Sequence, residues 1–283
     1  MIFADSISDY TRSLYVIYGV LFDGTSSFRA GSRWAPEAIR KGSYNFEPYD
    51  YDYDCDLANV PVYDMGDAEF GNVNDMIAEL QPTIFRVIKD GKVPIILGGE
   101  HSVTLPCIRA LAQDTSVTAV IFDAHLDLKE CYLGNMYGHA SVSRNILGCS
   151  IPLIQIGVRS GTRAEYQYAR EKSTFFTMDQ IRRDGIGNVL NSVSRLIESN
   201  SVYLSIDMDV LDPAYAPGVG NPEPYGLTPF ELRTAIRHLA PLASGFDVVE
   251  IAPDYDMGMS AIAGAKIVRD FVVAHSNVHI LLT

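Results

Sequence analysis

Three short polar clusters, far apart in this chain of 283 residues, together hold two histidines and four aspartates. These residues are His101, Asp123, His125, Asp127, Asp207 and Asp209. Imidazole and carboxylate groups bind divalent transition metals, and the excess of carboxylates favours a hard ion such as Mn²⁺ over Zn²⁺. A catalytic zinc site typically uses three protein ligands. Six ligands therefore fit two ions that share carboxylates.

The spacing within the clusters supports this interpretation. Alternate residues of an extended segment point to the same side, so the Asp-x-His-x-Asp pattern over 123–127 presents three ligands together, and Asp207 and Asp209 do the same. A single histidine or aspartate after a strand more often packs in the core or caps a helix. Six such groups indicate a common cation, because buried ionised carboxylates are costly when unpaired.

Each cluster follows an apolar run that is typical of a buried strand in a parallel sheet. The runs cover residues 93–97, 117–122 and 202–206. Open α/β sheets place their ligand sites at the carboxyl ends of strands. We therefore expect the three clusters to meet at one edge of one sheet.

Strand-like and helix-like segments alternate along the rest of the chain. Further strands are expected over 14–21, 151–156, 173–178 and 246–249. Helices are expected to begin near Pro36 and Thr228, and to cover 73–89, 104–112, 163–172, 189–198 and 261–273. This alternation predicts an α/β fold with a mostly parallel sheet and right-handed crossovers. We see no linker or repeat and expect a single domain over 1–283, with 44–56 as an exposed loop.

Net charge, cysteine spacing and hydropathy limit which partners and which location we expect for the protein. A net charge of −13 disfavours binding to nucleic acid or to an anionic membrane surface. The same charge is compatible with a cationic substrate, or with solubility alone. The four cysteines have no C-x-x-C spacing, which favours reduced thiols. Without a signal-peptide pattern or an apolar run long enough to span a bilayer, we expect a cytoplasmic protein.

The three clusters resemble the signatures of the ureohydrolases, the family of arginase and agmatinase. The segments that carry the resemblance are 98–102, 123–127 and 205–213, with further similarity at 23–31, 36–40, 216–218 and 248–256. The last of these looks more like agmatinase than arginase. The resemblance implies a three-layer α/β/α fold and a homo-oligomer, either a trimer or a hexamer.

The resemblance also implies a role for each site residue. Two Mn²⁺ per subunit are expected. One ion would be held by His101, Asp123, Asp127 and Asp207. The other would be held by His125, Asp123, Asp207 and Asp209, so that Asp123 and Asp207 bridge. His139 matches the family's catalytic histidine, and Glu250 matches the carboxylate that pairs with the guanidinium.

This chemistry explains the residue types. A guanidinium carbon is a poor electrophile, and two metal ions can hold a bridging hydroxide as its nucleophile. Glu250 can accept two N–H bonds from the flat guanidinium. Asp127 can relay the proton of the nucleophile to the leaving amine, and His139 can exchange protons with solvent. Agmatine is the leading substrate, which would give urea and putrescine.

The identity of the substrate tail stays open. Aminopropylagmatine, guanidinobutyrate and arginine are the alternatives within the class, and the loop 128–138 is expected to lie beside the pocket. Glu130 in this loop either binds a distal ammonium or faces solvent. A zinc-dependent amide deacetylase would need fewer carboxylate ligands, and a non-catalytic binding protein would have lost a ligand or Glu250. The intact His101 and Asp127 argue against the deacetylase, and the intact ligands and Glu250 argue against the binding protein.

Several other residues are expected to have no direct role. Arg159 and Arg163 are expected to be exposed basic residues, although they could orient a substrate. His238, His275 and His279 are expected to be surface or packing residues. The chain has no phosphate-binding loop, no complete dinucleotide-binding fingerprint and no G-x-S-x-G nucleophile motif, which argues against those enzyme classes.

Overall fold

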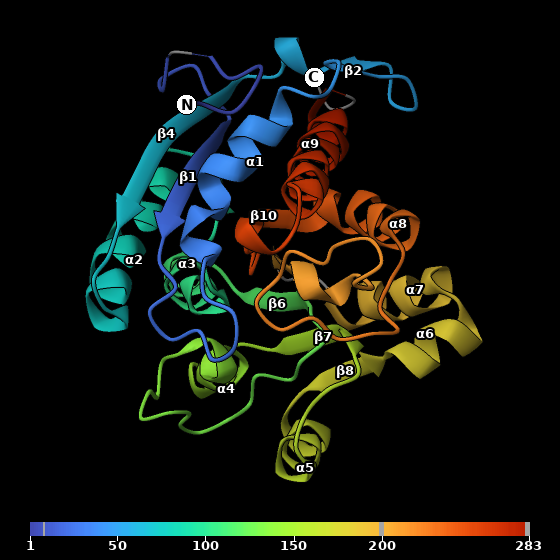
Figure 1. The fold of residues 1–283 in the computed structure, drawn as a ribbon. Helices are drawn as coiled ribbons and strands as arrows, with labels where there is room; N and C mark the ends of the chain where they lie inside the picture. The colour runs from blue at the N-terminus through green and yellow to red at the C-terminus, as the bar shows by residue number, and fades with distance from the viewer. Residues whose placement is uncertain (8, 198–200, 281–283) are drawn as a thin grey trace.

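The computed structural model describes residues 1–7, 9–197 and 201–280. Its main feature is an eight-stranded sheet with the order β4-β1-β5-β10-β9-β6-β7-β8 (Figure 1). The strands are β1 (Tyr15–Leu21), β4 (Val62–Glu69), β5 (Val93–Leu97), β6 (Val117–Phe122), β7 (Leu153–Val158), β8 (Thr174–Thr177), β9 (Ser201–Asp207) and β10 (Ala243–Val249). Every neighbouring pair in this sheet runs parallel. The prediction of a mostly parallel sheet is confirmed.

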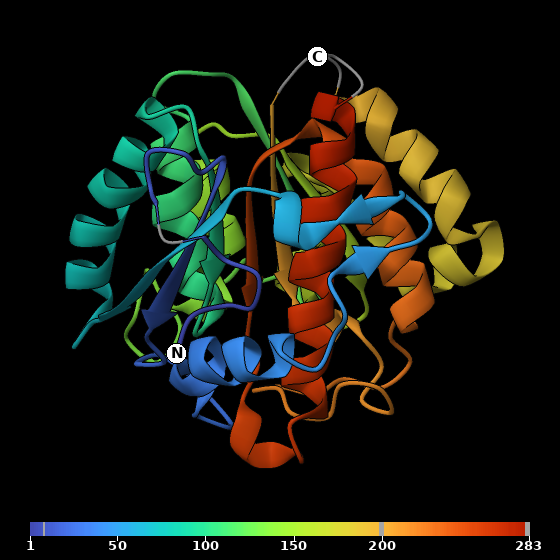
Figure 2. The same ribbon diagram turned by 90° about the horizontal axis from the view of Figure 1, so that it is seen from above.

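Helices cover both faces of the sheet, as Figure 2 shows. One face packs against α1 (Ala35–Ser43), α6 (Met178–Asp184), α7 (Ile186–Ile197), α8 (Pro229–Leu239) and α9 (Met259–Ile280). The other face packs against α2 (Val73–Lys89), α3 (Thr104–Leu111) and α4 (Val142–Gly148). A smaller apolar cluster lies beside α5 (Arg163–Lys172). Two large buried clusters, one on each face, confirm the expected three-layer α/β/α fold.

Short 3₁₀ turns join the layers. They are η1 (Ser32–Trp34), η2 (Leu57–Asn59), η3 (His101–Val103), η4 (His139–Ser141), η5 (Met208–Val210), η6 (Ala240–Leu242) and η7 (Pro253–Tyr255). Three of these turns, η3, η4 and η5, carry residues that the sequence singled out for chemistry. The helix start predicted at Thr228 is present as a capping box: Thr228 Oγ1 accepts from the Glu231 N–H at 3.2 Å, and Glu231 Oε2 accepts from the Thr228 N–H at 2.8 Å.

The segment 44–56 is more ordered than an exposed loop, so that expectation was wrong in part. It contains the antiparallel pair β2 (Tyr49–Asp50) and β3 (Cys55–Asp56). Asp50 is buried and pairs with Arg237 at 2.9 Å, and Asp52 pairs with Arg237 and Arg233 at 2.6 Å each. The partners lie on α8, far away in sequence, and local composition carries no sign of such pairing.

Other boundaries also differ from the expectations. The edge strand β4 was missed because its residues, Val-Tyr-Asp-Met-Gly-Asp-Ala-Glu, give no apolar run. The last residue of the predicted helix 189–198 lies outside the described residues. All four cysteines are free. Among residues 1–7, 9–197 and 201–280, no helix is long and apolar enough to cross a bilayer. The single domain over 1–283 stays a prediction.

Candidate metal centre

The polar clusters follow strands that are neighbours at the centre of the sheet. In the order β5-β10-β9-β6, adjacent strands end at Leu97, Val249, Asp207 and Phe122. Since all run parallel, their carboxyl ends meet at one edge, as expected. Gly99 allows one close approach here, because a Cβ at this position would lie 1.8 Å from the carbonyl oxygen of Phe22. This glycine lets the loop that bears His101 pack directly on the neighbouring backbone.

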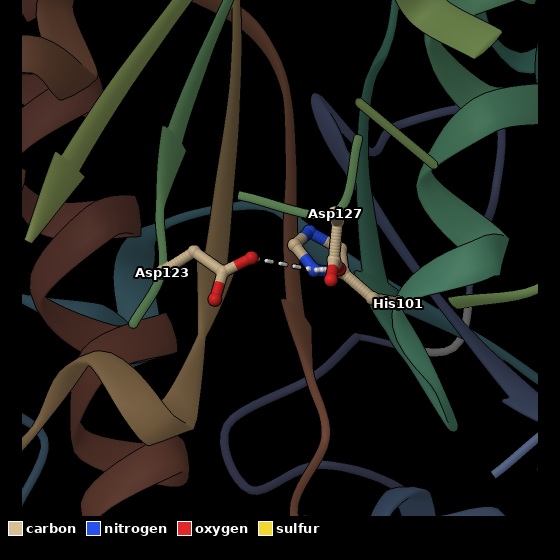
Figure 3. A group of neighbouring side chains, drawn as sticks. All are labelled: His101, Asp123 and Asp127. Atoms are coloured by element: carbon tan, nitrogen blue, oxygen red, sulfur yellow. Dashed lines mark ion pairs between the residues drawn. The ribbon is translucent and has the colours of Figure 1, made fainter. Parts of the chain in front are cut away.

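One group of ligand atoms surrounds His101. Its Nδ1 atom lies 3.1 Å from Asp207 Oδ2, 3.3 Å from Asp123 Oδ2 and 3.5 Å from Asp127 Oδ2. Figure 3 shows the carboxylates of Asp123 and Asp127 beside the ring of His101. All four side chains are buried. Donor atoms of His101, Asp123 and Asp127 lie close enough together to hold one metal ion.

A second group adjoins the first and shares Asp123 with it. His125 Nδ1 lies 3.0 Å from Asp209 Oδ2 and 3.6 Å from Asp123 Oδ1. Donor atoms of Asp123, His125 and Asp209 form a second set that could hold an ion. The two oxygens of Asp123 thus face different histidines, an arrangement that suits a carboxylate bridging two ions.

The unpaired atoms of the site fit a cation. His101 Nδ1 and Asp123 Oδ2 are buried without a well-formed hydrogen bond, which is unfavourable unless another group satisfies them. Four carboxylates surround two imidazoles, so negative charge is in excess. Divalent cations would satisfy the orphaned atoms and neutralise the carboxylates, and nitrogen and oxygen donors of this kind suit Mn²⁺. The residues present therefore fit a metal centre.

Without metal, the ligands compete for protons. Burial raises the pKa of Asp207 well above its usual range, and the charges of Asp209 and Asp123 raise it further. For His101, burial lowers the pKa, but the neighbouring carboxylates of Asp123, Asp127 and Asp207 outweigh this effect and the net shift is strongly upward. Both upward shifts favour the protonated forms of Asp207 and His101, which reduces the excess of negative charge in the buried cluster.

Glu250 directly follows β10, and its side chain contacts the backbone of one member of this cluster, His101. Its Oε1 atom accepts from the backbone N–H of His101 at 2.7 Å. Burial, followed by the charge of Glu100, raises the pKa of Glu250 to about 8. Its φ angle of 66° is in the left-handed region, which costs a residue with a Cβ roughly 1–2 kcal/mol. Such strain is found most often at functional sites.

His139 begins η4 and is held by hydroxyl groups from the N-terminal part of the chain. Its Nδ1 lies 3.2 Å from Thr25 Oγ1, and its Nε2 lies 3.2 Å from Ser27 Oγ. Thr25 Oγ1 in turn donates to the buried carboxylate of Glu100. His139 and Glu250 line the same cavity as four of the metal-ligand candidates, His125, Asp127, Asp207 and Asp209. The structure thus brings together all eight residues that were singled out for chemistry.

The cavity has an empty volume of about 530 Å³, including the part open to solvent. Eight of its lining residues were not among the predicted site residues: Ser26, Ser27, Arg29, Lys129, Tyr132, Ala140, Gly220 and Asn221. Lys129 and Tyr132 belong to the loop 128–138, so the expectation that this loop borders the pocket is confirmed. The side chain of Glu130 in this loop is 83% exposed and lies 4.0 Å from Arg144, which favours the solvated interpretation.

Arg159 corrects another expectation. Its side chain is only partly exposed, and it donates to the carbonyls of Asp209 at 2.6 Å, Glu223 at 2.7 Å and Pro224 at 2.9 Å. It therefore ties the turn that bears Asp209 to a distant loop. Basic character alone could not reveal this role, because its partners are backbone atoms. Arg163 is exposed, as expected.

The remaining histidines are as expected where they are described. His275 is buried and its Nδ1 lies 2.8 Å from the Tyr15 hydroxyl, and His238 forms an exposed contact with Ser194. The side chain of His279 lies outside the described part of the chain.

A comparison with known families identifies the chain. The model of the arginase family matches residues 13–274. The chain belongs to the arginase family. As a member of this family it is an enzyme, an amidino hydrolase.

Individual family members are similar over nearly their whole length. An agmatinase from Pyrococcus horikoshii is 37% identical over 89% of this chain and 89% of its own. An N(1)-aminopropylagmatine ureohydrolase from Thermococcus kodakarensis is 37% identical over 90% of this chain and 88% of its own. The crystal structure of agmatine ureohydrolase of Thermoplasma volcanium superposes with a TM-score of 0.95 at 38% identity, covering 100% and 96% of the two chains.

Proposed function

We propose that this arginase-family enzyme hydrolyses agmatine to urea and putrescine with two Mn²⁺ per subunit. One observation carries the proposal: two groups of histidine and aspartate share Asp123, beside a cavity that also holds Glu250 and His139. The proposed ligands are His101, Asp123, His125, Asp127, Asp207 and Asp209. When bound, the two cations supply Lewis-acid activation of a water molecule as the nucleophile.

The residues of the chain supply binding and proton transfer. The carboxylate of Glu250 binds the flat guanidinium and fixes the orientation of its carbon. A cationic substrate favours the ionised form of Glu250, whose burial otherwise raises its pKa to about 8. Asp127, beside His101 at 3.5 Å, carries the proton from the attacking water to the leaving amine. His139 exchanges protons with solvent through the same cavity.

Aminopropylagmatine is the second candidate substrate. A relative with that specificity in its name is as similar to this chain, at 37% identity, as one named agmatinase. The two substrates share the guanidinium and differ in the tail, so the same centre serves both. The tail would lie beside Tyr132 and Asn221, which line the cavity without belonging to either ligand group.

A urea assay tests the proposal. Protein loaded with Mn²⁺ is offered agmatine, aminopropylagmatine, guanidinobutyrate and arginine, and we expect the highest kcat/KM for agmatine. Glu250→Gln keeps an oxygen for the His101 N–H but removes the charge, so it should lose activity about 100-fold or more while retaining metal. His125→Ala should lose both activity and metal. Urea from arginine alone would overturn the assignment of agmatine as the substrate. Urea from none of the four compounds would overturn the proposed function.

The proposal includes a homo-oligomer of three or six chains. Several large apolar side chains are exposed on the surface: Phe28 is 70% exposed, Tyr225 84% and Met257 98%. Exposed apolar groups of this size mark contact surfaces when they are contiguous. The mass in solution, measured by light scattering, is expected to be that of a trimer or hexamer, and a monomer would contradict this part of the proposal.

A further inference from the structure

The ring of His101 has a second partner on its other nitrogen. Its Nε2 atom lies 3.2 Å from Ser205 Oγ, on β9. Ser205 Oγ donates to Asp247 Oδ1, on the neighbouring strand β10, at 2.6 Å. The three side chains are completely buried. A continuous path of hydrogen bonds therefore leads from the imidazole to a carboxylate that lies outside both candidate ligand groups.

The direction of these hydrogen bonds follows from the groups involved. Asp247 accepts from three hydroxyls, those of Ser205, Thr104 at 2.8 Å and Tyr203 at 2.9 Å. Burial raises the pKa of Asp247, and these donors oppose that shift. A serine hydroxyl has a single proton to donate. Ser205 gives it to Asp247, so its oxygen accepts from the ring, and Nε2 of His101 is the protonated nitrogen.

The other ring nitrogen is thereby left for a metal. His101 Nδ1 faces Asp123, Asp127 and Asp207 at 3.1–3.5 Å. In metal sites a ligating histidine usually donates its second N–H to a neighbouring acceptor, which fixes both the tautomer and the ring orientation. The path through Ser205 has this geometry.

We propose that Ser205 and Asp247 are positioning residues that hold His101 in the Nε2–H tautomer, so that Nδ1 is free to bind one of the two cations. The inference rests on the proposed function, because the metal-binding role of His101 is part of that proposal. Sequence analysis assigned no role to either residue, although Ser205 begins the segment 205–213 that carries the family resemblance.

The alternative is that Ser205, Thr104, Tyr203 and Asp247 only satisfy one another's hydrogen bonds in the core and do not position His101. Tyr203→Phe provides a matched control, because it removes one donor to Asp247 but leaves the path from His101 through Ser205 intact. Ser205→Ala removes the acceptor of the Nε2–H. Asp247→Leu removes the carboxylate, so that the Ser205 hydroxyl is free to donate to the ring instead.

The experiment measures the affinity of the metal-free, full-length protein for Mn²⁺ by competition with a chelator. Ser205→Ala and Asp247→Leu are expected to weaken one of two bound ions by about 10- to 100-fold, while Tyr203→Phe stays within about threefold of wild type. Nitrogen-15 spectra of the metal-free protein at alkaline pH are expected to show Nε2–H for His101 in wild type and Tyr203→Phe. The preference should be lost in Ser205→Ala, a small change that keeps the test available if Asp247→Leu does not fold.

The two proposals fail in different ways. If the wild-type protein binds no Mn²⁺, the proposed function fails. If the wild type binds two ions and Ser205→Ala binds both with unchanged affinity and unchanged tautomer, the positioning role is wrong and the proposed function stands. Equal loss of affinity in Ser205→Ala and Tyr203→Phe would also overturn the inference, because it would indicate a purely structural network.

Discussion

The ring of His101 is buried among three carboxylates, and its protonation should control metal loading. Burial alone would lower the pKa of this histidine, but Asp123, Asp127 and Asp207 raise it well above its ordinary value. At neutral pH, without metal, Nδ1 therefore carries a proton that a cation must displace. As the pH falls, this proton becomes harder to remove, so the affinity for metal should fall as well.

Calorimetry measures this effect directly. Titration of the metal-free protein with Mn²⁺ in two buffers of different ionisation enthalpy should reveal proton release at about pH 7, and the apparent affinity should rise between about pH 6 and 8. His125, whose pKa is also raised by Asp209 and Asp123 against the effect of burial, should contribute in the same direction. A pH-independent affinity without proton release would contradict this account of the site.

Single residues were the most predictable part of the site. The ligand types and their alternation in 123–127 predicted which side chains come together, and the structure brings them together. Residues that act through backbone contacts were not predictable in this way. Arg159 has carbonyl oxygens as partners, and their positions depend on how two distant loops fold. Ser205 and Thr25 lie in segments that resemble the family's, but the sequence did not indicate which groups their hydroxyls contact.

At the scale of elements, Arg159 fastens the turn η5 to the loop that contains Glu223 and Pro224. Replacing it with methionine keeps the apolar stem but removes the donor to the partly buried carbonyls of Asp209 and Glu223. We expect Arg159→Met to lower the free energy of unfolding by about 2–4 kcal/mol. The exposed Arg163, four residues further along, is the matched control. Arg163→Met should change the free energy of unfolding by no more than about 0.5 kcal/mol.

Thermal unfolding of the metal-free protein, followed by circular dichroism, compares the two variants without any contribution from bound cations. A similar small shift for both would show that the contacts of Arg159 contribute little to stability. Metal affinity of Arg159→Met should also fall, since Asp209 lies in the turn that this arginine holds.

Strands with continuous apolar runs were predictable, whereas their order was not. The runs before the three clusters became β5, β6 and β9, and their carboxyl ends meet as expected. The insertion of β10 between β5 and β9 is a property of topology, and this insertion carries Glu250 to the centre. The polar edge strand β4 and the pair β2–β3 were missed because tertiary contacts define them.

For the whole molecule, alternating strands and helices predicted a mostly parallel α/β sheet, and the family resemblance implied three layers. The packed clusters on both faces of the sheet agree with both. The net charge of −13 disfavoured some classes of partner but could not specify the substrate. Acidic groups at the metal centre and acidic groups on the surface contribute equally to the net charge. The specificity for the substrate tail could not be predicted from the sequence either. It depends on cavity-lining side chains from three separated regions, such as Arg29, Lys129 and Asn221.

The central claim is that two cations are held between three strand ends and share Asp123. Diffraction from crystals grown with Mn²⁺, recorded at the manganese absorption edge, tests it most directly. The account predicts two anomalous peaks in each subunit, one beside His101 and Asp127 and the other beside His125 and Asp209, with Asp123 in contact with both. A single peak, or ions bound away from these residues, would contradict it.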